Sequence, residues 1–221
     1  MVAVSAGTVV PGIVLTRAEW LAERISDMGI SWGTGDTRVS GTLWWCMAAS
    51  SLIDPVVAAY ASGLPVPDTV LEHLLCEVRP DGGIERVFRA ALPAGPAASE
   101  AVASVPAEDP GRNLRETLAR IIPVVAEVSG AGVASLWAIV ADAIGNRAID
   151  AGDAEAGARL ARQVAGRLPV PRFTDIGERT FVRRISCCLV FEVPNCQMCT
   201  SCPKRPADER HELLSALAAG G

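Results

Sequence analysis

Hydrophobic residues recur every three or four positions along most of the chain, the spacing that lines one face of an α-helix. Capping patterns mark two helix starts, Thr16-Arg-Ala-Glu19 and Asn113-Leu-Arg-Glu116, and a glycine at position 29 marks an expected end. A proline at position 55 predicts a kink or a new start inside the longest apolar helix. The predicted helices cover residues 16–29, 40–63, 70–75, 113–125, 135–151, 153–168 and 208–219.

Two short stretches favour β-structure instead. Pro80-Asp-Gly-Gly83 is a strong turn signal between residues 77–78 and 84–88, so the sequence predicts a small β-hairpin there. Residues 189–193 have the composition of a short strand. The predicted fold class is therefore mainly α with a small β element. It is a helical bundle of two linked parts with a C-terminal cysteine-rich segment.

Proline and alanine gather in one stretch of the chain, residues 93–112, which has the composition of a linker. The sequence thus predicts an N-terminal helical region with the hairpin at 1–92 and a C-terminal helical region at 113–221. The second region contains the cysteine-rich segment, residues 180–206.

Composition and charge narrow the class of protein. The 221 residues are 50% hydrophobic, enough for a buried core, and the net charge of −5 argues against a nucleic-acid partner. The longest strongly apolar uncharged stretch, 39–53, is shorter than the roughly 20 residues that span a bilayer, so no integral membrane segment is predicted. The first 16 residues lack the basic start of a signal peptide, and we expect a cytoplasmic protein.

Seven cysteines are present, and five of them fall within residues 187–202. In a reducing compartment such a group indicates a metal site rather than disulfides. Thiolates suit zinc, iron or an iron–sulfur cluster, although two adjacent cysteines are a poor fit for an ordinary zinc ribbon. A structural zinc knuckle or plain buried thiols remain the alternatives. Cys46 and Cys76 lie apart and are predicted to pack in the core.

The stretch Arg183-Arg-Ile-Ser-Cys-Cys-Leu-Val-Phe-Glu-Val-Pro194, followed by Cys199-Thr-Ser-Cys-Pro203, resembles the C-terminal signature of FhuF-like ferric-siderophore reductases. That signature is a cysteine doublet, ten residues, then C-x-x-C. The resemblance implies a helical fold and one [2Fe–2S] cluster. The ligands that it implies are Cys187, Cys188, Cys199 and Cys202.

An additional cysteine, Cys196, lies between the doublet and the C-x-x-C pair. The run Cys196-x-x-Cys199-x-x-Cys202 mimics part of the bacterial ferredoxin motif for a [4Fe–4S] cluster, but no fourth cysteine follows it. A [4Fe–4S] cluster would have to use a cysteine of the doublet, and this alternative stays open. We expect Cys196 to be a bystander.

The resemblance implies an oxidoreductase that reduces Fe(III)-siderophore by one electron and releases Fe(II) in the cytoplasm. No flavin or dinucleotide motif is recognised, so the electron would come from an external protein, a ferredoxin or a flavoprotein reductase. The alternative is an electron-transfer carrier or redox sensor without its own siderophore substrate. Four basic residues flank the cysteines and are predicted to raise the potential and guide anionic chelates, unless they are only solvated surface charges: Arg183, Arg184, Lys204 and Arg205.

Overall fold

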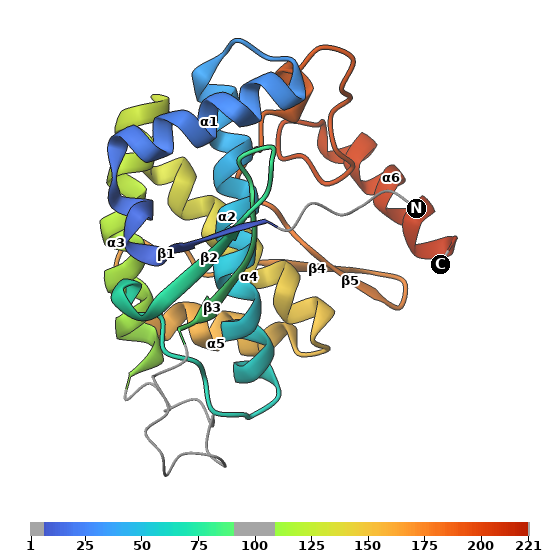
Figure 1. The fold of residues 1–221 in the computed structure, drawn as a ribbon. Helices are drawn as coiled ribbons and strands as arrows, with labels where there is room; N and C mark the ends of the chain where they lie inside the picture. Colours follow the sequence, from blue (N-terminus) through green and yellow to red (C-terminus); the bar gives the residue numbers. More distant parts are fainter. Residues whose placement is uncertain (1–6, 91–108, 221) are drawn as a thin grey trace, which may run out of the picture.

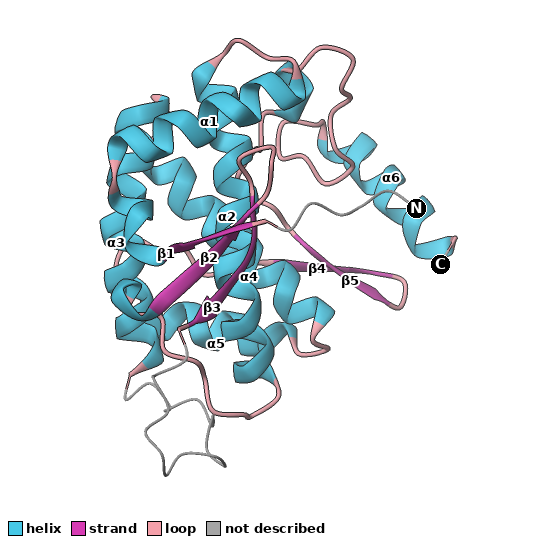
Figure 2. Cartoon of the chain, viewed as in Figure 1, coloured by secondary structure: helices cyan, strands magenta, loops and turns pink. Residues whose placement is uncertain are grey.

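The computed structural model describes residues 7–90 and 109–220 (Figure 1). Residues 93–108 of the predicted linker lie outside this part. The fold is mainly α-helical with small antiparallel sheets, as predicted (Figure 2). The helices are α1 (Ala18–Trp32), α2 (Thr37–Ala61), α3 (Pro110–Ser129), α4 (Val133–Asp150), α5 (Ala154–Val164) and α6 (Ala207–Ala219). The strands are β1 (Thr8–Pro11), β2 (Leu74–Val78), β3 (Ile84–Arg89), β4 (Phe173–Ile176) and β5 (Arg179–Val182).

Helix α2 lies at the centre of the molecule, and helices from both sides of the linker pack around it. It contacts α1, α3, α4 and α5, and its other side lies against β3 (Figure 1). A Cβ at Gly41 would lie 2.2 Å from the Cβ of Ser129, so only glycine permits the close crossing of α2 and α3. These helices share one hydrophobic core. The predicted regions 1–92 and 113–221 follow one another in the sequence and both contribute to this core. Their division into two domains stays a prediction.

Two adjacent tryptophans, whose rings stack on each other, anchor α2 to two different elements. Trp44 and Trp45 are fully buried, and their indole N–H groups donate to the carbonyl oxygens of Gly82 and Leu136 at 2.9 and 3.0 Å. By length and composition α2 resembles a membrane span, and 56% of its most apolar window is buried inside the protein. A central core helix has this composition because it meets apolar neighbours nearly all round. Pro55 lies within this one continuous helix.

The predicted hairpin is confirmed. Strands β2 and β3 pair antiparallel around the turn at residues 80–83, where Gly82 has φ +82°. Strand β1, which the sequence analysis did not predict, pairs with β2 and completes a three-stranded sheet. A second hairpin, β4–β5, was also missed and leads directly into the cysteine-rich segment.

The predicted strand at 189–193 is wrong. Residues Val190–Glu192 form one turn of 3₁₀ helix, because Leu189 has φ +61° and its carbonyl accepts from the amide of Glu192. Leu189 and Val193 are buried in the common core. These two apolar side chains therefore anchor a loop rather than a strand.

Several helix boundaries differ from the prediction, and the short helix predicted at 70–75 is one turn of 3₁₀ helix, Leu71–His73, followed by β2. The hydroxyl of Thr16 donates to the Ile13 carbonyl instead of forming a capping box. Helix α1 continues past residue 29 and ends at Gly33, which adopts the left-handed conformation. Helix α3 begins three residues before Asn113, because the side chain of Asp109 caps it by accepting from the Arg112 amide.

Candidate metal centre

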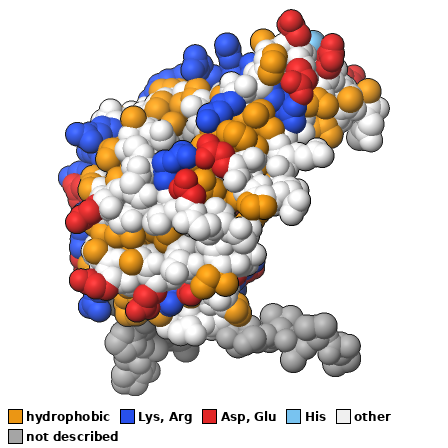
Figure 3. Space-filling model, turned by 90° about the horizontal axis from the view of Figure 1, so that it is seen from above, with side chains coloured by type: hydrophobic (Ala, Val, Ile, Leu, Met, Phe, Trp, Pro, Cys, Tyr) orange, Lys and Arg blue, Asp and Glu red, His pale blue; other side chains and the backbone are white. Residues whose placement is uncertain are grey.

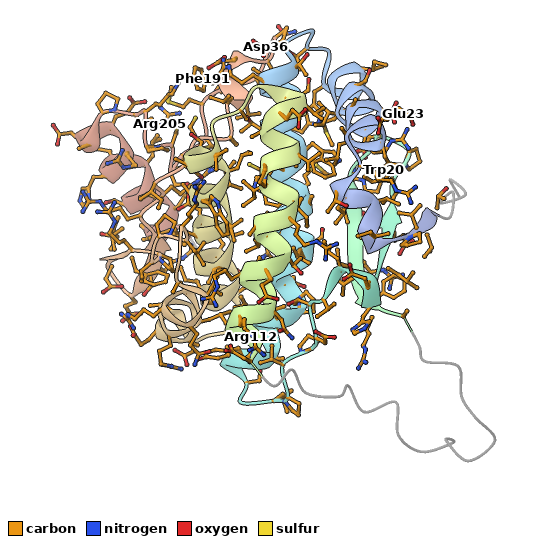
Figure 4. The ribbon with its side chains drawn as sticks, turned by 90° about the vertical axis from the view of Figure 1, so that its left-hand side faces the viewer. Trp20, Glu23, Asp36, Arg112, Phe191 and Arg205 are labelled. Atoms are coloured by element: carbon orange, nitrogen blue, oxygen red, sulfur yellow. The ribbon has the colours of Figure 1, made fainter. Side chains whose placement is uncertain are left out.

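The cysteine-rich segment follows β5, packs against the first half of α2 and the middle of α4, and then enters α6 (Figure 1). Contacts with both helices hold it in place. Arg38 near the start of α2 donates to Glu192 at 2.6 Å, and Asp142 of α4 accepts from the amides of Ile185 and Ser186. In Figure 4, Phe191 of this segment lies close to Asp36, the N-cap of α2. The fold therefore brings residues from the middle of the chain to the cysteines.

The four cysteines of the predicted ligand set form two facing pairs. The Sγ atoms of Cys187 and Cys202 lie 3.7 Å apart. Cys188 lies beside Cys199, and the thiol of Cys199, with the Val190 amide and the nearby charge of Arg184, lowers the pKa of Cys188 to about 5. The adjacent members of the doublet thus face different partners.

This arrangement fits a binuclear cluster. Two thiolates on one tetrahedral metal, with bonds of about 2.3 Å, lie about 3.8 Å apart, close to the observed separation of Cys187 and Cys202. Two pairs suit two metal ions, whereas a zinc knuckle places four ligands around one ion.

Two N–H donors already point at sulfur atoms. The backbone amide of Leu189, turned by its positive φ, donates to Cys187 Sγ at 3.4 Å. The Nη1 atom of Arg184 donates to Cys199 Sγ, also at 3.4 Å. The Nε atom of Arg184 is buried without a hydrogen-bond partner among the described residues. Such donors stabilise negative charge on sulfur and tune a cluster's potential.

Arg184 is the predicted basic residue that reaches the cysteines. Its side chain is only 16% exposed. Burial acts to lower the pKa of Arg184, but the negative charges of Cys188 and Asp142 outweigh burial and raise this pKa above its usual value. The residue therefore carries a permanent positive charge against the cysteine pairs.

The other three predicted basic residues have different surroundings. Arg205 donates to the carbonyl oxygens of Met198 and Cys199, so it holds the backbone of the loop. Lys204 is half exposed, 4.9 Å above the ring of Phe191, with Nζ 3.8 Å from Glu192. Arg183 is exposed to solvent. From above, cationic and anionic side chains are interspersed on this face rather than forming one basic patch (Figure 3).

Two neighbours of the cysteine pairs were missed. Asp142 is a buried carboxylate in α4, and the sequence signal was a lone acidic residue within the apolar run 136–144. Cys46 of α2, predicted as a core residue, is near enough to Cys188 to sense its charge. Burial first, and this charge second, raise the pKa of Cys46 to about 12, so its thiol stays protonated. Cys76 is buried in β2, as predicted.

Cys196 is partly buried, packs against the core, and its amide closes a turn by donating to the Val193 carbonyl at 3.1 Å. Neither contact engages the two cysteine pairs. A bystander role remains our expectation for this residue.

Comparison with known protein families identifies the segment. The family model of the FhuF 2Fe-2S C-terminal domain matches residues 184–204, which contain both cysteine pairs. The segment is thus a 2Fe–2S domain of the FhuF type, and its cofactor is a [2Fe–2S] cluster; both predictions are confirmed. The match covers about a tenth of the 221-residue chain. No curated protein matches the chain.

Proposed function

We propose that the protein is a cytoplasmic ferric-siderophore reductase that passes one electron to a bound Fe(III) chelate and so releases Fe(II). The observation that supports this most directly is the FhuF-type 2Fe–2S domain with its two facing cysteine pairs. Free thiols throughout the described chain suit a reducing compartment.

We assign one iron to Cys187 with Cys202 and the other iron to Cys188 with Cys199. This assignment follows the two pairs that the fold brings together. The cluster supplies reversible one-electron transfer when bound. The chain orients the thiolates, and Cys202 is 1% exposed, so water is excluded from one side. The other three cysteines are only partly buried, which supports access of a large substrate to the cluster.

The substrate class follows from the chemistry of iron release. Siderophores bind Fe(III) through hard oxygen donors, and the larger, less charged Fe(II) is held far more weakly by such donors. One electron therefore suffices, and no side chain has to act as acid, base or nucleophile. Exposed Arg183 and half-exposed Lys204 are placed to attract an anionic chelate, which supports their predicted guiding role.

The test is to mix the reduced protein, without oxygen, with ferric hydroxamate and ferric catecholate chelates. We expect the cluster spectrum to return to its oxidised form, with one Fe(II) trapped for each cluster oxidised. The matched control is the gallium(III) chelate, which has similar shape and charge but accepts no electron, and it should leave the cluster reduced. A cluster that stays reduced with every ferric chelate would show a carrier or sensor without its own siderophore substrate.

The electron reaching the cluster is proposed to come from a ferredoxin or a flavoprotein reductase. Support comes from the sequence, in which we recognise no flavin or nicotinamide motif. Adding each class of donor with its own reductant, and following bleaching of the cluster, tests this part separately. Failure of both donor classes to reduce a cluster that dithionite does reduce would contradict it.

A further inference from the structure

Asp142 is a carboxylate buried in α4, with only 3% of the residue exposed. Its Oδ1 accepts from the amide of Ile185 at 3.1 Å. Its Oδ2 accepts from the amide and the hydroxyl of Ser186 at 2.9 and 2.6 Å. All three donors belong to the two residues that precede the cysteine doublet, so Asp142 fixes the backbone from which the doublet projects.

The same carboxylate is also paired with a cation. Nε of Arg184 lies 3.5 Å from Oδ2 of Asp142, while Nη1 of that guanidinium donates to Cys199 Sγ at 3.4 Å. The contact with Asp142 is an ion pair in which Nε makes no hydrogen bond to any residue that the structure describes, and because the guanidinium is planar and rigid, attraction at this edge orients the opposite edge. Arg184 thus bridges a buried carboxylate and a cysteine of the opposite pair.

A carboxylate loses its hydration on burial and is tolerated only with hydrogen bonds and a counter-charge. Residues 184–186 supply both to Asp142. An apolar residue at this position would pack into α4 as well as its alanine neighbours do, but it would leave the two amides and the guanidinium without their partner. The buried charge therefore serves the cysteine-rich segment rather than the helix that carries it.

We propose that Asp142 is a positioning residue for the cluster, which holds Arg184 so that its guanidinium donates to Cys199 Sγ. This inference rests on the cluster ligation given under the proposed function and is independent of the siderophore substrate. If Asp142 positions Arg184, the effects of these two residues on the midpoint potential depend on each other with a defined sign.

The sign of this coupling follows from two opposing effects of Asp142→Asn on the midpoint potential. Asp142→Asn removes a negative charge, which by itself favours the reduced cluster and raises its midpoint potential. If Asp142 also positions Arg184, the same variant weakens the bond to Cys199, which lowers the potential. The second effect requires Arg184, so the shift caused by Asp142→Asn should be more negative when Arg184 is present than when it is Gln.

The experiment measures the midpoint potential of the intact cluster protein in four forms: the natural chain, Asp142→Asn, Arg184→Gln, and the double variant. We expect the two Asp142→Asn shifts to differ by at least threefold in the equilibrium constant for reduction, or about 28 mV at 59 mV per tenfold change. Equal shifts in the two backgrounds would overturn the proposal, because charge alone would then explain them.

Glu192→Gln is the matched control. It also removes one negative charge from the neighbourhood of the cysteines, but Glu192 contacts Arg38 and Lys204 rather than Arg184. Its shift should be the same with and without Arg184. A coupling of Glu192 to Arg184 as large as that of Asp142 would also overturn the proposal.

Ser186→Ala provides a second variant if Asp142→Asn does not retain the cluster. It removes one donor from Asp142 without changing any charge. We expect a shift in potential in the natural background that shrinks by at least half in the Arg184→Gln background, and an undiminished shift would contradict the positioning role. Absence of iron and sulfide from the natural chain would instead refute the cluster ligation itself. This outcome differs from the contrary results given for the Asp142→Asn and Ser186→Ala variants.

Discussion

The replacements Arg184→Gln and Lys204→Gln separate the two kinds of basic residue near the cluster. Arg184 is 16% exposed and donates to Cys199 Sγ, whereas Lys204 is 50% exposed and lies beside Glu192. Each of the two replacements removes one positive charge. We expect them to differ in the size of their effect on the midpoint potential and in its dependence on salt.

The magnitude follows from the charge that reduction adds. One additional negative charge at about 5 Å from a guanidinium, at an effective dielectric constant of about 20, gives about 3 kcal/mol. The carboxylate of Asp142, 3.5 Å from Nε of Arg184, is present in both the natural chain and the variant, so its own effect on the potential drops out of the comparison. Arg184→Gln should therefore lower the potential by roughly 130 mV at 59 mV per 1.4 kcal/mol.

The exposed lysine should matter less. Lys204 is half exposed, and a solvated charge contributes about 0.2–1 kcal/mol, so Lys204→Gln should lower the potential by about 10–40 mV. Raising the salt concentration to about 1 M shortens the screening length to about 3 Å. The Lys204 effect should then vanish, while the effect of the buried Arg184 should persist.

Potentiometric titration followed by the spectrum of the reduced cluster measures both variants. The same variants should be mixed with anionic and cationic ferric chelates at low salt, where Lys204→Gln should slow only the anionic one. Equal shifts from the two variants, or a shift from Arg184→Gln that disappears in high salt, would refute the reasoning from burial.

Three further predictions follow from the structure. Serine in place of any one of the four ligand cysteines should abolish or alter the cluster spectrum, whereas Cys196→Ser should leave it; an unaltered spectrum after loss of Cys188 would contradict the ligand set. Removing the cluster should expose residues 183–206 to protease while α1–α5 stay folded, because metal binding stabilises a segment with few buried apolar residues; equal cleavage with and without cluster would argue against this. Trp44→Ala should cost about 3–5 kcal/mol of unfolding free energy, measured by denaturant titration, because it leaves a cavity in the core; an unchanged midpoint is the contrary result.

Local signals in the sequence were sufficient for much of the fold. The β2–β3 hairpin was predictable because the residues at 80–83 themselves favour the backbone conformation of a tight turn. The strand predicted at 189–193 failed because apolar residues also anchor loops, and Leu189 packs into a core that distant helices build. Composition cannot distinguish these two uses of an apolar run.

The resemblance to FhuF-like reductases implied a set of four cysteines, but not which of them face each other in the fold. Adjacent residues of the doublet face different partners, and that choice depends on where the fold places Cys199 and Cys202. Asp142 was invisible for a related reason. Its partners lie more than 40 residues later in the chain, so only the packing of α4 against the cysteine-rich segment shows what the carboxylate holds.

The most direct test of the account is the metal content and spectrum of the full chain purified without oxygen. We expect two iron and two sulfide ions per chain, and a cluster that takes up one electron to give a paramagnetic reduced state. One zinc ion per chain without sulfide, or four iron ions per chain, would contradict the assignment of the two cysteine pairs to a [2Fe–2S] cluster.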